Sequence, residues 1–268
     1  MPGETASYRI MNKLSPYSME PPRPLPMRLA LPLTKPLLSW LILALNAFIW
    51  LLMTLGGGST NPIVLIRFGA KVSWLVATGE YWRLFTAIFL HIGFLHLAFN
   101  SYALYSLGPQ IESLYGRSRF LTIYLVGGLA GSAASYALSE SLSAGASGAI
   151  FGLIGALAIY LIRHSDILGR RGKQALTNVV VVIFYNLVLS FAVPGIDVLG
   201  HLGGLLGGLS VAWFLCPDYR IALESNGLPL LVDDNNLKRQ WRWLALAILL
   251  LVLCIGLGTL HWQGSIKI

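Results

Sequence analysis

Four polar side chains in an otherwise apolar sequence are suited, by type and spacing, to acyl transfer. Ser147 stands in the segment Gly145-Ala146-Ser147-Gly148, and a serine hydroxyl becomes a good nucleophile when a neighbouring base takes its proton. His201 is the candidate base. His96 and Asn100 are four residues apart, hence on one helix face, and both can donate hydrogen bonds to the oxyanion of a tetrahedral intermediate. This chemistry requires elements that bring the four side chains together.

The composition indicates an integral membrane protein. Of the 268 residues, 56% are hydrophobic and 11% are charged, whereas a soluble domain carries about 25% charged residues. The net charge is +8, but the basic residues lie mostly in tails and turns between apolar runs. There they are expected to orient helices in the lipid bilayer, and no nucleic-acid partner is expected. Cys216 and Cys254 form no CxxC pair and are expected to be ordinary apolar residues.

Hydropathy predicts an all-α fold, a polytopic membrane helix bundle with seven spans. Spanning takes about 20 apolar residues. The first run is longer than the apolar part of a signal peptide, and no clear cleavage site follows it. Two shorter apolar pieces, 63–68 and 72–77, are expected to form short helices that lie along the membrane within the first loop. The spans are expected at about 37–55, 92–107, 119–138, 146–162, 174–192, 198–215 and 243–260.

The chain is expected to divide into four parts. Residues 1–36 are rich in proline and basic, which predicts a flexible cytoplasmic tail. Residues 37–215 contain six spans and all four candidate residues. Residues 216–242 are polar and are expected to form a cytoplasmic linker. Residues 243–268 are expected to form an extra transmembrane helix and a short tail.

The distribution of Lys and Arg predicts a cytoplasmic N-terminus and an external C-terminus. The short outer turns carry Glu140 and Asp197 and no Lys or Arg, although the long first loop is an exception. The inner turn at 163–173 carries Arg163, Arg170, Arg171 and Lys173.

Depth in the membrane then tests whether the four candidates can meet. At about 1.5 Å per residue, all four fall within one layer, a helical turn or two thick, near the outer face. Small residues spaced four apart let helix backbones approach closely, as a hydrogen bond between Ser147 and His201 requires. Such glycines are Gly200, Gly204 and Gly208 in one span and Gly148 and Gly152 in another. A packing motif and an interhelical polar clamp remain open as alternatives.

Other chemistries are less consistent with the sequence. His91, His96 and His201 could meet around zinc, but the sequence has no HExxH motif, and neither a metal nor a cofactor is expected. An aspartyl-type membrane protease needs a pair of carboxylates, and none lies within the relevant predicted spans. Asp197, four residues before His201, is expected in an exposed turn, so a two-residue dyad is favoured. A transporter or channel would often show internal repeats and charged pathway residues, and neither is visible.

Taken together, these segments resemble the rhomboid intramembrane serine proteases. The resemblance covers about residues 37–215 in family order, and Glu112 and Gly116 also fit. The matching pieces are Trp82-Arg83, the segment 91–100, Gly145-Ala146-Ser147-Gly148, and Gly200-His201 with the glycines that follow.

The resemblance implies that Ser147 is the nucleophile and His201 the general base and acid. It assigns oxyanion stabilisation to His96, Asn100 and the backbone N–H of Ser147. It also implies a six-helix core with an extra C-terminal span, an outer water-filled cavity over Ser147, and a lateral entrance beside the fifth helix. Phe151 stands where some members carry a tyrosine that packs on the catalytic histidine.

The expected function is therefore that of an intramembrane serine endopeptidase that cleaves transmembrane segments of membrane proteins. The alternative is a catalytically inactive rhomboid-like protein that binds membrane clients. The expected location is a bacterial inner membrane. The sequence predicts no particular oligomeric state, substrate or cleavage site.

Overall fold

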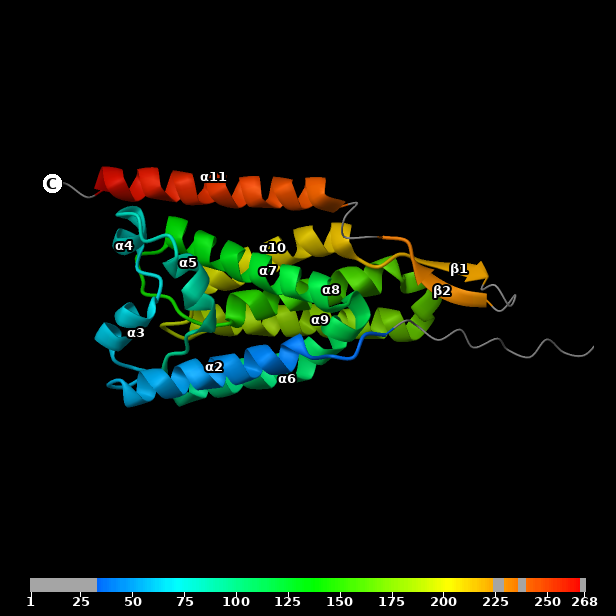
Figure 1. Ribbon diagram of the computed structural model, residues 1–268, viewed down its shortest axis with the longest axis horizontal. Helices are drawn as coiled ribbons and strands as arrows, with labels where there is room; N and C mark the ends of the chain where they lie inside the picture. Colours follow the sequence, from blue (N-terminus) through cyan, green and yellow to red (C-terminus); the bar gives the residue numbers. More distant parts are fainter. Residues whose placement is uncertain (1–32, 224–228, 236–239, 266–268) are drawn as a thin grey trace, which may run out of the picture.

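The computed structural model describes residues 33–223, 229–235 and 240–265, which form a bundle of long helices with one β-hairpin (Figure 1). Residues 1–32 of the predicted tail, residues 224–228 and 236–239 of the predicted linker, and residues 266–268 after the predicted extra helix lie outside the described residues. The elements in chain order are α2 (Leu38–Leu55), α3 (Pro62–Phe68), α4 (Ser73–Ala77), α5 (Arg83–Thr86), η1 (Ala87–Phe89), α6 (Gly93–Tyr115), α7 (Arg117–Leu138), α8 (Ser147–Arg163), α9 (Ser165–Ala192), α10 (Val198–Leu215), β1 (Tyr219–Leu223), β2 (Pro229–Asp233) and α11 (Trp241–Ser265).

The all-α membrane bundle predicted from hydropathy is confirmed. Among the described residues, five helices are long and apolar enough to cross a membrane: α2, α7, α9, α10 and α11. The α5–η1 segment and α6 form a further candidate span, bent by 84°. The shorter apolar helix α8 has 17 residues, and it is the helix that begins at Ser147.

Two turns predicted between spans, at 108–118 and 163–173, are largely helical instead. α6 continues past Pro109 to Tyr115, although the span was expected to end at about residue 107. α9 begins at Ser165, not at about 174, and contains a break at Gly169, where φ is 55° and ψ is −137°. Polar residues mark where a chain leaves the apolar part of a membrane, but a helix can continue beyond that point.

The centre of the bundle is built from α7, α8 and α10, which meet backbone to backbone. A Cβ on Gly131 of α7 would lie 2.5 Å from the Gly200 carbonyl oxygen of α10 and 3.3 Å from Gly148 Cα of α8. A Cβ on Gly204 would overlap the backbone of Gly148, and one on Gly208 would overlap that of Gly152. The close approach predicted from the glycine spacing is therefore confirmed.

A buried carboxylate from α6 caps the start of the first long helix, α2. The Glu112 side chain is fully buried, and its two oxygens accept hydrogen bonds from the backbone N–H groups of Leu37, Leu38 and Ser39 at 2.7–2.8 Å. The Ser39 hydroxyl donates a fourth. The first N–H groups of a helix have no partner within it, and negative charge there is favourable. Glu112 therefore ties α6 to the start of α2.

The first loop lies at one end of the bundle, where α3, α4 and α5 gather (Figure 1). The two short helices predicted in this loop are confirmed as α3 and α4. Lys71, between them, is fully buried, and its Nζ donates to the carbonyl oxygens of Ser141 at 2.7 Å, Ser139 at 3.1 Å and Ser135 at 3.2 Å. Because the last carbonyls of a helix lack partners within it, Lys71 anchors the loop to the end of α7.

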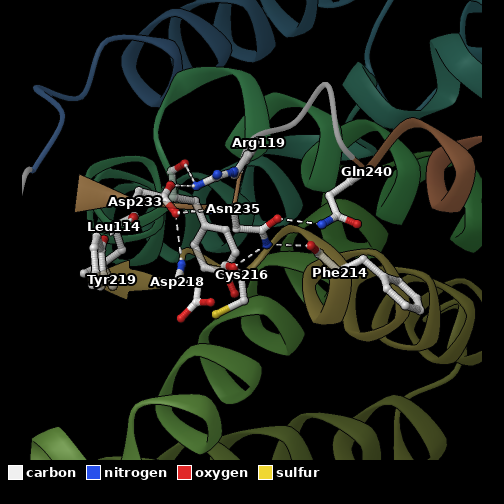
Figure 2. Close-up of polar contacts among 10 residues, drawn as sticks. Leu114, Arg119, Phe214, Cys216, Asp218, Tyr219, Asp233, Asn235 and Gln240 are labelled. Carbon is white, nitrogen blue, oxygen red and sulfur yellow. Dashed lines mark hydrogen bonds and ion pairs between the residues drawn. The ribbon is translucent and has the colours of Figure 1, made fainter. Parts of the chain in front are cut away.

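The predicted linker contains an antiparallel hairpin, β1–β2, at the opposite end of the bundle (Figures 1 and 2). Arg119 at the start of α7 donates to the Asp233 carboxylate. The Asn235 amide donates to the carbonyl oxygens of Phe214 at 2.8 Å and Cys216 at 2.7 Å, which satisfies the end of α10. These contacts join the hairpin to the core, so this part of the segment is structured.

The extra C-terminal helix, α11, runs along one side of the bundle (Figure 1). Its Trp262 indole donates to the Tyr136 carbonyl oxygen at 2.6 Å, and its Thr259 hydroxyl lies 2.9 Å from the Tyr136 hydroxyl. Gln263 donates to the Ala77 carbonyl oxygen of α4 at 3.1 Å. The helix therefore contacts both α7 and the first loop.

Candidate active site

Ser147 is the first residue of α8 and is half-buried. Two hydrogen bonds donated by its backbone hold the chain before Ser147. Gly145 N–H donates to the Ala87 carbonyl oxygen at 2.9 Å, and Ala146 N–H donates to the His91 side chain, at Nε2, at 3.4 Å. The first N–H groups of a helix have no partner within it and carry partial positive charge. Ser147 thus combines a hydroxyl with backbone donors that could bind an oxyanion.

The start of α8 is recessed below the end of α7. The contacts of Gly131 place Gly148 level with it, and α7 continues from there to Leu138. Seven residues of α-helix correspond to about 10 Å. Ser147 therefore lies below the end of α7, on the side of the bundle that carries the first loop.

His201, in the first turn of α10, is buried beside the same face of α8. Its ring stacks on Phe151, with centroids 4.5 Å apart and an interplanar angle of 19°. Phe151 is four residues after Ser147 and so shares its helix face. The packing of Phe151 on the histidine, implied by the family resemblance, is confirmed.

Within the described part of the chain, no hydrogen bond joins Ser147 to His201. The Nδ1 atom of His201 instead lies 2.7 Å from the hydroxyl of Ser190, in α9. Catalytic hydrogen bonds are often long in unliganded enzymes and shorten when substrate binds. The dyad stays a prediction, based on the positions of α8 and α10.

His96 is placed against the segment that precedes Ser147. A Cβ on Gly145 would lie 2.8 Å from His96 Nε2, so only glycine leaves room for the ring. Ile92 N–H donates to His96 Nδ1 at 3.4 Å. A neutral imidazole that accepts at one nitrogen carries its hydrogen on the other, so His96 Nε2 is a donor beside Gly145, two residues before Ser147.

Asn100 lies one turn further along α6 and is buried. Its amide nitrogen donates to the His96 carbonyl oxygen at 2.9 Å, which uses one of its two N–H groups. The structure thus brings His96 to the Ser147 segment and holds Asn100 against the His96 backbone.

Asp197 caps α10 and is occupied by that task. One carboxylate oxygen accepts from Gly200 N–H at 2.9 Å, and the other pairs with the Ser143 hydroxyl. An aspartate that accepts from a backbone N–H at a helix start stabilises that helix. Asp197 therefore helps to fix the turn that presents His201.

Ser190 is the residue at this site that the sequence interpretation missed. The fifth span contains no carboxylate, and a single serine in an apolar helix is easily tolerated. The depth argument applied to the other candidates would have found it, because Ser190 lies in the last turn of α9, next to the short turn that leads to His201.

Comparisons with known proteins show the family of the chain. A family model described as the Rhomboid domain matches residues 78–218, more than half of the chain. Rhomboid protease GluP of Bacillus subtilis (strain 168) is 48% identical over 178 residues, covering 66% of this chain and 34% of GluP. Putative rhomboid protease YdcA of the same strain is 36% identical over 178 residues, covering 65% of this chain and 86% of YdcA.

A third relative, Rhomboid protease AarA of Providencia stuartii, is 34% identical over 178 residues, covering 57% of this chain and 63% of AarA. The chain thus spans about a third of GluP and most of YdcA. With the family model over more than half of the chain and YdcA matched over most of its length, this integral, multi-pass membrane protein belongs to the rhomboid family.

Proposed function

We propose that the protein is an intramembrane serine endopeptidase that cleaves transmembrane segments of membrane proteins. Ser147 Oγ attacks the scissile carbonyl carbon while His201 Nε2 takes the hydroxyl proton, and the C–N bond breaks as Nε2 gives that proton to the leaving amine. Water, activated by the same Nε2, then hydrolyses the acyl-serine ester and regenerates the Ser147 hydroxyl. The backbone N–H of Ser147, His96 Nε2–H and the Asn100 amide stabilise the oxyanion.

One observation carries the proposal. Ser147 lies at the recessed start of α8, and α10, which carries His201, packs on α8 without intervening Cβ atoms at Gly204 and Gly208. Two short side chains can reach hydrogen-bond distance only across such a close pair of helices. GluP and AarA are named as rhomboid proteases, which supports the same reaction here.

The bilayer is the expected source of substrate. A recessed nucleophile surrounded by apolar helices is accessible to a peptide that enters from the membrane. The distribution of Lys and Arg supports a cytoplasmic N-terminus and an external C-terminus. We further propose that the protein resides in a bacterial inner membrane.

The test is cleavage of a single-span membrane protein by the purified chain in liposomes. Ser147→Ala and His201→Ala should each lower kcat by about three orders of magnitude or more, because nucleophile and base act as a unit. The control is Ser210→Ala, which removes an exposed hydroxyl from α10 and should leave cleavage unchanged.

A fluorophosphonate probe separates the two functional readings of the fold. An activated Ser147 should be labelled in the wild type and not in Ser147→Ala. Cleavage retained by Ser147→Ala would exclude this serine as the nucleophile. A folded wild type that neither cleaves nor is labelled would favour the inactive, client-binding alternative.

A further inference from the structure

Ser190 is the one side chain that α9 buries. Of the 28 residues in this helix, only Gly172 and Ser190 are buried, and glycine has no side chain. Neighbouring apolar residues are strongly exposed, with Phe184 at 62% and Phe191 at 72%, as expected for a helix that faces lipid. The helix therefore directs a single hydroxyl into the protein, and that hydroxyl contacts His201.

The direction of the hydrogen bond follows from counting hydrogens. Ser190 Oγ lies 2.6 Å from the Asn186 carbonyl oxygen and 2.7 Å from His201 Nδ1. A carbonyl oxygen only accepts, and a hydroxyl has one hydrogen to donate. Because that hydrogen goes to Asn186, Ser190 Oγ must accept at His201, and the Nδ1 atom carries the proton.

We propose that Ser190 is a positioning residue that holds His201 in the tautomer with hydrogen on Nδ1 and a free lone pair on Nε2. This inference rests on the proposed protease function, since only Nε2 would then act as base toward Ser147. The face of the ring is held by Phe151, so the stack and the Ser190 contact together define its orientation.

The proton movements are balanced. When Ser147 attacks, its proton passes to Nε2 and the ring becomes an imidazolium that retains hydrogen on Nδ1. The Nδ1–H···Oγ bond is then charge-assisted, and such bonds are stronger than neutral ones. Ser190 thus favours the charged state more than the resting state, which is the requirement for accelerating the reaction. Nε2 then gives its proton to the leaving amine.

Kinetics of Ser190 variants of the whole chain test the inference. Ser190→Ala should lower kcat about tenfold with little change in KM, as expected for one lost hydrogen bond that strengthens in the transition state. Ser190→Thr retains the hydroxyl and should regain most of that loss. Ser210→Ala is the matched control, because the Ser210 hydroxyl also bonds to a carbonyl one turn earlier, that of Leu206, without contacting a histidine.

The outcomes separate this inference from the proposed function. If Ser147→Ala is inactive but a folded Ser190→Ala protein has wild-type kcat, the Ser190 role is wrong and the protease proposal stands. If Ser147→Ala still cleaves, the proposed function itself fails. A Ser190→Ala defect confined to KM, or one that Ser190→Thr does not relieve, also overturns the positioning role.

A measurement on the wild type avoids any folding defect of the variants. Nitrogen NMR of histidine-labelled protein reports which ring nitrogen carries hydrogen, with His201→Gln used to assign the signal. The expected result is a neutral His201 ring protonated at Nδ1. A neutral ring protonated at Nε2 would overturn the inference.

Discussion

The helices at the centre of the bundle and those at its edge are held by different kinds of contact. Half of the α10 span is buried, against 6% of the α9 span and 11% of the α11 span. The central helices α7, α8 and α10 meet through glycine backbones. The edge helices make polar contacts through individual side chains, such as Ser190 with His201 and Thr259 with Tyr136.

This difference suggests a division of tasks. Backbone-to-backbone packing leaves no rotamers to adjust, and protein interiors tolerate added volume poorly. The centre therefore sets the distance between the candidate nucleophile and base. A hydrogen bond from an edge helix can then orient a ring that is already in place.

The largest expected effect is on the central packing. In Gly204→Ala the new methyl group would overlap the Gly148 backbone, next to Ser147. We expect a loss of about 1–3 kcal/mol in stability, as in other overpacked cores, and loss of most cleavage activity. Thermal unfolding in detergent and the liposome cleavage assay provide the measurements.

The matched control is Gly256→Ala in α11, where a Cβ would have nothing within 4 Å. Replacement of an exposed helical glycine by alanine should stabilise by up to about 1 kcal/mol. If Gly204→Ala and Gly256→Ala changed the unfolding temperature and the cleavage activity equally, the distinction between centre and edge would be wrong.

Lys71 tests how the first loop is attached to the central helix α7. Lys71→Met keeps an unbranched side chain but leaves the Ser141 carbonyl oxygen without its donor. The Ser139 carbonyl oxygen loses one of two donors and still accepts from the Ser73 hydroxyl. We expect a loss of about 1–3 kcal/mol, the usual cost of unsatisfied buried polar groups. Arg67→Met, at an exposed position of the same loop, should have little effect on the unfolding temperature.

The contribution of Lys71 to the free energy of unfolding should also depend on pH. Burial lowers the pKa of Lys71 from 10.5 to about 8, although the charge of Asp197 opposes this shift. Between these two values the unfolded chain binds more protons at this group than the folded protein, so stability rises with pH. The stability advantage of wild type over Lys71→Met should therefore increase from about pH 8 to 10.5. A constant difference across this window would contradict the assignment.

The smallest expected loss of stability is at the contact between the edge helix α11 and α7. Thr259→Val conserves shape but removes the partner of the buried Tyr136 hydroxyl, at an expected cost of about 1 kcal/mol. Cleavage should be nearly unchanged, because this contact joins α11 to α7 and lies outside the proposed dyad. Thr177→Val, in exposed α9, removes a hydroxyl bonded to the Lys173 carbonyl oxygen and is the control. A large loss of activity in Thr259→Val would mean that the edge helix also shapes the site.

Elements with strong local signals were predictable. The α10 bounds agree with the predicted span at 198–215, because apolar composition and a terminal proline define both its ends. The contact between Phe151 and His201 followed from a family pattern. The hairpin and the helical extension of α6 were not predicted, because their residues are polar or mixed and have distant partners. Arg119 contacts Asp233 of the hairpin, and the start of α2 donates to Glu112 of α6.

The sequence by itself determined the apolar spans, the glycine spacing that permits close helix packing, and the types of Ser147, His201, His96 and Asn100, and it predicted a common depth for these four residues. These are properties of composition and helical periodicity, which need no knowledge of neighbours. Only the tertiary structure decided that Asp197 caps α10, that Glu112 of α6 accepts hydrogen bonds from the first N–H groups of α2, and that Ser190 contacts His201. A hydrogen bond between helices depends on their relative rotation and distance, and these are set by packing over the whole bundle.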